Sequence, residues 1–320
     1  MCANTELIAG VDSFLIWGDE ATFGTAGTVD THLGLVTDFN PKHNRTAKEH
    51  RGFTGSTSGG QEAVKTTAGK YEGGFSVDFI PLEWSWIEFV LGSASGTGSS
   101  EDPFIYSRSN NPAGLTFSSN KNNVTTDSEG LFLGSRFESV TIRASKDDNE
   151  VTCSAVVQCV NFTKDSTIAT NVALPTGEVF VMAGASIELP DSSAISHIID
   201  NVEITINRNP KRLHGLGSHV STQSKYGAIE YRVNFTVNYL DDTFMDDLMG
   251  SATTMDNIMT NNATLTVRLQ SLTNANRNVE FKFTNVTFPE IDEKDTLNDF
   301  ITEGITGWCQ TLTVEEQTST

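Results

Sequence analysis

At 320 residues, the chain is long enough for two domains of ordinary size, each with its own hydrophobic core. Hydrophobic residues make up 37% of the sequence, which excludes an intrinsically disordered protein, and a formal net charge of −20 argues against a reader of nucleic-acid sequence. The 19 phenylalanines outnumber the 4 tryptophans and 5 tyrosines combined, and this composition favours pleated strands over helices.

The first residues give no sign of a targeting segment. Met1 to Gly18 contains no Lys or Arg and carries Glu6 and Asp12, so we expect no signal peptide. No apolar stretch approaches the roughly 20 residues that are needed to span a bilayer, so we expect no membrane insertion.

The next elements alternate between polar loops and amphipathic segments. Asn40 to Lys42 reads Asn-Pro-Lys and opens a glycine-containing loop, and Tyr71 to Phe79 alternates between apolar and polar residues as a half-buried strand does. Leu82 to Leu91 predicts one short helix that ends at Gly92-Ser93. Ser93 to Gly130 is rich in Ser, Gly and Asn, which predicts a long surface loop.

The same order of elements recurs in the second half of the chain, which predicts an internal duplication with its boundary near residue 165. The two expected domains are 1–165, with the 93–130 loop as an insertion, and 166–320. The matched segments are Asn40 to Lys42 with Asn209 to Lys211, Tyr71 to Phe79 with Tyr231 to Tyr239, Leu82 to Leu91 with Asp242 to Met249, Val140 to Arg143 with Leu265 to Arg268, and Val151 to Phe162 with Val279 to Phe288.

Two details refine this pattern. The apolar positions of Val279 to Phe288 change face after Phe283, which predicts a β-bulge or a strand that changes sheets. The glycine-containing segments Asn40 to Lys70 and Asn209 to Tyr226 are expected to be mobile loops that become ordered at contacts between subunits.

The four cysteines are too few and too scattered for a disulfide framework. Cys153 and Cys159 fall on one face of a predicted strand about 20 Å apart, which is too far for a disulfide. We therefore expect folding in a reducing cytoplasm. The other two cysteines are Cys2 and Cys309.

No motif predicts catalysis or metal binding. The sequence lacks the signatures of serine hydrolases, zinc proteases, P-loops and dinucleotide sites. His43 with His50, and His214 with His219, match no usual zinc spacing, so we interpret them as loop histidines. The acidic clusters are interpreted as helix caps and solvated surface, because they lack the central glycine of a calcium loop. They are Asp241-Asp242, Asp246-Asp247 and Glu290 to Asp295.

The tryptophans could form a carbohydrate platform, but core packing is the simpler interpretation. Trp84 and Trp86 cannot share one side of a helix, so at least one of them is expected in a core or interface. We therefore expect no catalytic, cofactor-binding or metal-binding residue, no cofactor, and no enzyme. The remaining tryptophans are Trp17 and Trp308.

One segment resembles a known family. Gly18 to Thr25 reads Gly-Asp-Glu-Ala-Thr-Phe-Gly-Thr and is similar to the Glu-x-x-(Tyr/Phe)-Gly-Thr opening motif of tube proteins from long, non-contractile viral tails. After this motif come Gly73 to Phe79 and then the predicted helix that ends at Leu91-Gly92, in the same order as in the family. The run from Val202 through Gly217 to Asp242 resembles its second half. The resemblance covers most of the chain outside Ser93 to Gly130.

This resemblance implies a mainly β fold of duplicated β-sandwich or half-barrel domains, each with a short flanking α-helix. It also implies a structural protein of the virion tail, assembled in the host cytoplasm, whose rings stack into a conduit for DNA. Partners would be copies of itself and the tape-measure, tail-terminator and baseplate proteins. Since the family places six domains around its channel, a duplicated chain would form a trimeric ring, with a hexamer as the alternative.

Two other classes stay open at this point. A secreted or surface β-sandwich adhesin would need an export signal, and a carbohydrate-binding module or carbohydrate-active enzyme would need converging aromatic or carboxylate groups. A net charge of −20 suits a passage for DNA, because Lys and Arg contacts would hold the phosphates. Like-charge repulsion between subunits also predicts that salt helps assembly.

Overall fold

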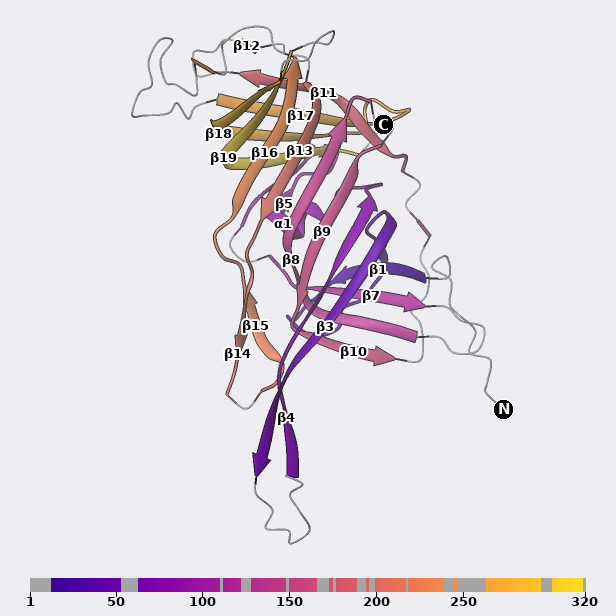
Figure 1. The fold of residues 1–320 in the computed structure, drawn as a ribbon. Coiled ribbons are helices and arrows are strands. Elements are labelled where there is room, and N and C mark those ends of the chain that lie inside the picture. Colours follow the sequence, from indigo (N-terminus) through magenta and orange to yellow (C-terminus); the bar gives the residue numbers. More distant parts are fainter. Residues whose placement is uncertain are drawn as a thin grey trace, which may run out of the picture.

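The computed structural model describes the chain apart from fourteen short segments, and the described part is almost entirely antiparallel β-structure (Figure 1). The prediction of a mainly β fold with a short flanking helix is confirmed. The residues outside the description are 1–12, 53–62, 110–111, 122–127, 148–149, 166–172, 175–176, 189–193, 196–198, 217, 239–244, 247–262, 295–300 and 319–320.

One continuous layer of eight antiparallel strands runs through both halves of the chain, and we call it the eight-strand layer. Its centre is the pairing of β8 with β13, which joins the first half to the second. The strand order is β3 (Leu35–Gly52), β4 (Ala63–Ile80), β9 (Thr152–Cys159), β8 (Ser128–Ser145), β13 (Ile199–Asn207), β16 (Glu230–Asn238), β19 (Thr302–Gln317) and β18 (Asn278–Lys294).

Two smaller sets of strands pack against this layer, and long strands pass from the layer into each set. The N-terminal part of β8 continues into a set of β10 (Asn161–Asp165), β7 (Leu115–Lys121), β1 (Ser13–Asp19) and β2 (Thr31–His32). The N-terminal part of β18 and the C-terminal part of β19 continue into a set with β17 (Ala263–Ser271), β11 (Phe180–Glu188) and β12 (Ala194–Ile195). Figure 1 shows the set with β11 and β17 at the top of the molecule and the set with β1, β7 and β10 lower, at its right side.

The core fills the space between the eight-strand layer and these sets. Phe75, Phe117, Phe132 and Phe137 are at most 2% exposed and contact one another edge to face or tilted. The ring of Trp84 lies 5.3 Å from that of Phe281 in the second half. The described buried side chains therefore form one connected core across the two halves.

The short helix α1 (Ile87–Leu91) begins later than the predicted Leu82. Ser85 and Trp86 form a turn, and the N–H groups of the first helical residues bond three residues back, so the segment tightens into a short element. The predicted end is confirmed, because Gly92 adopts a left-handed φ of 118° and donates its N–H to the Glu88 carbonyl.

Ser93 to Gly130 is not a surface loop, so this prediction is wrong. The segment contains β5 (Gly92–Ser95), β6 (Phe104–Arg108), β7 and the start of β8. The polar composition misled the prediction, because two of its polar residues, Ser118 and Asn120, are buried and hydrogen-bonded in β7. Ser118 Oγ donates to Glu129 Oε1 at 2.6 Å, and Asn120 Nδ2 donates to Ser118 Oγ at 2.7 Å.

The two expected glycine-containing loops are also largely strand. The described part of Asn40 to Lys70 lies in β3 and β4, whose hairpin extends away from the rest of the molecule (Figure 1). Asn209 to Tyr226 contains the hairpin of β14 (Lys211–His214) and β15 (Ser221–Lys225). The two hairpins meet, because Tyr71 donates its N–H to the His219 carbonyl at 2.8 Å. Of the predicted second helix, Asp242 to Met249, only residues 245 and 246 are described, and both are helical.

The bulge predicted in Val279 to Phe288 is confirmed. The register of β18 shifts against β17 between Ala263 and Leu265, and against β19 between Thr287 and Glu290. Asn285 lies within the first of these shifts, between Phe283 and Val286 of β18, with a left-handed φ of 52°.

Candidate functional site

The eight-strand layer has one buried face and one accessible face. Val77, Ile142, Ile204 and Val233 point to the core and are at most 1% exposed. Their neighbours along each strand point the other way, and many are small polar residues. We call this accessible surface the polar face. Its members include Ser76, Ser139, Thr141, Ser154, Thr205, Asn207, Asn234, Thr236 and Thr306.

The basic residues on the central strands of the polar face lie beside carboxylates. Arg143 Nε lies 2.7 Å from Glu203 Oε2 across the β8–β13 junction, and Arg232 Nη2 lies 3.9 Å from Glu230 Oε2. Paired guanidinium groups attract phosphate less strongly than free ones, because the neighbouring carboxylate repels it. Such a face can lie along nucleic acid without holding it.

Glu20, from the segment that resembles the tube-protein motif, organises a junction of three strands. Its carboxylate accepts hydrogen bonds from the N–H of Gly24 at 2.6 Å, the N–H of Gly134 at 2.7 Å and Thr116 Oγ1 at 3.0 Å. Burial raises the pKa of this carboxyl, although these hydrogen bonds and the charge of Arg136 act in the opposite direction. The motif therefore has a structural role, which the sequence did not reveal.

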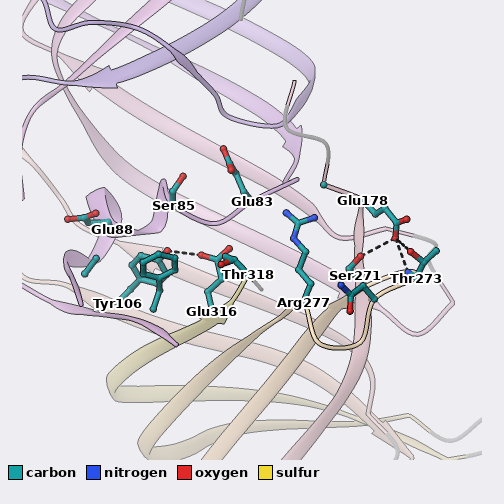
Figure 2. A pocket seen from close by; sticks show the side chains of 14 residues that line it. Glu83, Ser85, Glu88, Tyr106, Glu178, Ser271, Thr273, Arg277, Glu316 and Thr318 are labelled. Atoms are coloured by element: carbon teal, nitrogen blue, oxygen red, sulfur yellow. Dashed lines mark hydrogen bonds between the residues drawn. The ribbon is translucent and has the colours of Figure 1, made fainter. Parts of the chain in front are cut away.

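A pocket of about 830 Å³ lies between α1, β6 and the second half, and Figure 2 shows its lining. Tyr106 Oη donates to Glu316 Oε2 at 2.6 Å, and the N–H of Trp84 donates to Glu316 Oε1 at 3.3 Å. Burial raises the pKa of Glu316. The guanidinium of Arg277 bonds the Leu82 carbonyl, so these contacts tie the two halves together.

The opposite wall of the pocket is built around Glu178. Its Oε2 accepts from Ser271 Oγ at 3.1 Å, from the N–H of Thr273 at 2.9 Å and from the Thr273 hydroxyl (Figure 2). The bonds from Thr273 lower the pKa of Glu178. The residues that line the pocket include Ser271 beside Glu178 but no histidine or cysteine. The lining therefore does not assemble a nucleophile with a base and an orienting group.

The interpretation as loop histidines is wrong for His43 and His50, which lie in β3, and for His214, which lies in β14. His43 packs on Phe162 with ring centres 4.3 Å apart, and its Nδ1 lies 2.9 Å from Tyr71 Oη. Burial lowers the pKa of His43. His214 lies in β14, and the side chain of His50 is outside the description. Within the described residues, no group of three or more His, Cys, Asp or Glu could hold a metal ion.

The tryptophans follow the core interpretation with one exception. Trp17, Trp84 and Trp86 are at most 5% exposed, but Trp308 is 55% exposed, so the core interpretation is wrong for Trp308. Trp308 lies on β19, directly opposite Arg232 of β16. By the alternation along the strand, it belongs to the polar face. Cys153, Cys159 and Cys309 carry free thiols, and burial raises the pKa of Cys159 to about 11.

These features define a β-rich structural subunit with a continuous polar face. The family model described as phage tail tube protein matches residues 10–299, so the chain belongs to the phage tail tube protein family. It is therefore a structural protein of the virion tail, and its family is a structural one, not an enzyme family. No curated protein matches the chain. No helix among the described residues is long and apolar enough to cross a membrane.

Proposed function

We propose that three copies of this chain close into a ring with pseudo-six-fold walls, that rings stack into the tail tube, and that the polar face lines the channel through which DNA passes. The observation that carries this proposal is the repeated order of strand pairings in the two halves. The first half pairs β3-β4-β9-β8 and then β8-β7-β1-β2, and the second half pairs β13-β16-β19-β18 and then β18-β17-β11-β12.

Irregularities of the pairing recur at the same places, which supports a duplication more strongly than strand order does. A bulge needs an extra residue at one defined position, so chance rarely repeats several of them in order. The matched shifts are Val36/Asp38 with Ile199/Asn201, Leu115/Phe117 with Ala263/Leu265, and Phe137/Ser139 with Thr287/Glu290.

Left-handed backbone at matching positions gives independent support. Gly134 has a φ of 58° in β8, and Asn285 has a φ of 52° in β18. Each lies in the segment where its strand's pairing shifts, and Gly and Asn are the residues that adopt this conformation most readily.

The bulges also revise which segments correspond. The sequence matched Val140 to Arg143 with Leu265 to Arg268 and Val151 to Phe162 with Val279 to Phe288, but the pairings favour a match of β8 with β18 and of β9 with β19. They also set Asn40 to Lys42 against Glu203 to Thr205 and not against Asn209 to Lys211. The counterpart of β17 is then β7, which lies in the segment expected to be a loop. The duplicated unit thus includes the polar strand that composition alone did not reveal.

A chain with two copies of the unit supplies two of six positions in a ring, so three chains complete it. Each half then meets the other half of a neighbour in a heterologous contact that closes by rotation. Closure also removes open sheet edges, which otherwise promote aggregation. Free thiols suit assembly in the host cytoplasm, and tape-measure, terminator and baseplate proteins would contact the ends and lumen of the tube.

Electron microscopy of the purified protein at high concentration tests this function. We expect rings and stacked tubes, with a ring mass of three times the 34.7 kDa chain by native mass spectrometry. Raising the salt concentration should promote assembly, because each chain carries a formal charge of −20. Rings of six chains would contradict the trimeric ring but not the tube-forming function. A protein that stays monomeric under all conditions would contradict both.

A further inference from the structure

The junction between the two halves provides a template for a contact between chains. Here β8 pairs with β13 in an antiparallel register that places Arg143 opposite Glu203 and Thr141 opposite Thr205. The Arg143–Glu203 ion pair crosses the junction on the polar face. If the halves are copies, the same junction can form between the second half of one chain and the first half of another.

The two strand edges that such a contact needs are open. Among the described strands, β3 pairs only with β4, and the stretch of β18 from Glu290 to Lys294 pairs only with β19. By the shared bulges, β3 corresponds to β13 and this stretch of β18 corresponds to the part of β8 that β13 covers. The residues of both edges from Pro41 to Arg45 and from Asp292 to Lys294 are exposed.

The shared bulges also fix the register between these edges. Asp38 is the first paired residue after the bulge of β3, and Asn201 has the same position in β13. Glu290 is the first paired residue after the second bulge of β18, and Ser139 has the same position in β8. Transfer of the β8–β13 register then places Lys42 opposite Asp292, Asn44 opposite Glu290, and Asn40 opposite Lys294. Lys42 and Asp292 take the positions of Thr205 and Thr141.

We propose that β3 of one chain pairs with the Glu290–Lys294 stretch of β18 of the next chain, in the antiparallel register that sets Lys42 opposite Asp292. The occupant of each edge is thus a second copy of this chain. This inference rests on the proposed function and adds the contact and register through which the ring closes. The backbone pairing provides strand addition, and the side chains select the register.

The charges of the two edges favour this partner over the alternatives. The β18 edge carries three acids and one base, Glu290, Asp292, Glu293 and Lys294, whereas the β3 edge carries two bases and one acid, Lys42, Arg45 and Asp38. Pairing β3 with β3, or β18 with β18, would instead bring together two edges of the same net charge, which is less favourable. Neither Lys42 nor Asp292 has an ion-pair partner among the described residues, so both charges are available.

Pro41 limits what else can add to this edge. Proline has no N–H, so β3 offers one donor fewer to any incoming strand, which weakens indiscriminate pairing. The proposed partner residue opposite Pro41 is Glu293, whose counterpart in the internal junction is Ile142. Charge and proline thus replace the isoleucines of the internal junction at an edge that is exposed before assembly.

Disulfide cross-linking tests the register. In a background with Cys2→Ser and Cys309→Ser, the pair Lys42→Cys with Asp292→Cys places two thiols directly opposite, at a Cα separation that a disulfide spans. We expect a covalent closed trimer on a non-reducing gel after assembly and mild oxidation. The matched controls Asn40→Cys with Asp292→Cys, and Asn44→Cys with Asp292→Cys, are displaced by two residues and should cross-link at least about tenfold less.

Charge reversal provides a second measurement. Lys42→Glu should slow assembly by about tenfold or more, and adding Asp292→Lys should restore it. Three results would overturn the register without contradicting the tube. They are tubes that form without the predicted cross-link, equal cross-linking by the displaced pairs, and failure of Asp292→Lys to restore assembly. If the wild-type protein forms no rings at all, the proposed function fails and the pairing fails with it.

Discussion

The covered edge of β8 and the open edge of β18 take equivalent places in the proposed duplication, but their chemistry is opposite. Ile142 and Ile204 face each other in the internal junction, and each is only 1% exposed. Their counterparts by the shared bulges, Glu293 and Pro41, are exposed. A junction that forms during folding can use apolar residues, whereas one that waits for another chain must keep its edges soluble and selective.

The largest effect should come from shortening a side chain in the internal junction. Ile142→Ala removes a fully buried side chain between β8 and β13, so we expect the free energy of unfolding to fall by about 2–5 kcal/mol. The matched variant Glu293→Ala, at the open counterpart, should change it by less than about 0.5 kcal/mol. Urea denaturation of the unassembled subunit measures both, and similar losses in the two variants would contradict the comparison.

The next largest effect should come from Glu20, which accepts the N–H of Gly134 at the bulge of β8. Glu20→Ala leaves the N–H groups of Gly24 and Gly134 and the Thr116 hydroxyl without their acceptor. We expect a loss of about 3 kcal/mol, because buried donors without a partner are costly. Glu20→Gln keeps one acceptor oxygen and should lose clearly less. Equal losses in the two variants would show that the hydrogen bonds are not the cause.

The two bulges themselves should differ in their tolerance of a side chain. A Cβ on Gly134 would meet Val160 Cγ2 at 2.3 Å, and the φ of 58° adds strain, so Gly134→Ala should cost about 1–3 kcal/mol. Asn285 is exposed and already has a side chain at a φ of 52°, so Asn285→Ala should cost only about 1 kcal/mol. Thermal unfolding of both variants measures the contrast, and a larger loss at Asn285 would reverse our account of the bulges.

The smallest effect concerns pH. Because burial raises the pKa of Glu316 in the folded protein, the folded state holds its proton more strongly than the unfolded state. This contribution to stability is therefore lost as pH rises from the ordinary carboxyl pKa through the raised value. On acidification from pH 7 to pH 5, wild type should gain more in melting temperature than Glu316→Gln. Identical pH dependence in the two proteins would rule out Glu316 as a source.

Local patterns predicted much of the fold, and long-range pairings decided the rest. Strict alternation in Tyr231 to Tyr239 and the change of face after Phe283 correspond to β16 and to the bulge of β18. β7 was missed because its polar residues are satisfied by partners elsewhere, such as Glu129 for Ser118. Composition cannot distinguish a buried hydrogen-bonded serine from a loop serine.

The polar face and its junction depended on tertiary information. Periodicity shows that a strand has a wet side, but it does not show that β8 lies beside β13 or that Arg143 meets Glu203. Glu20 was noticed as part of a motif, yet its three donors come from segments up to 114 residues away in sequence. Only the pairing of strands across the chain places these groups together.

The most direct test of the duplicated, three-chain tube is an electron-microscopy reconstruction of the assembled tube that resolves individual strands. We predict three chains per ring and a continuous wall in which β3 of each chain runs antiparallel to β18 of the next, with Lys42 opposite Asp292. A ring in which the edges of β3 and of the Glu290–Lys294 stretch are both left on the outer surface, without a neighbouring strand, would contradict the account.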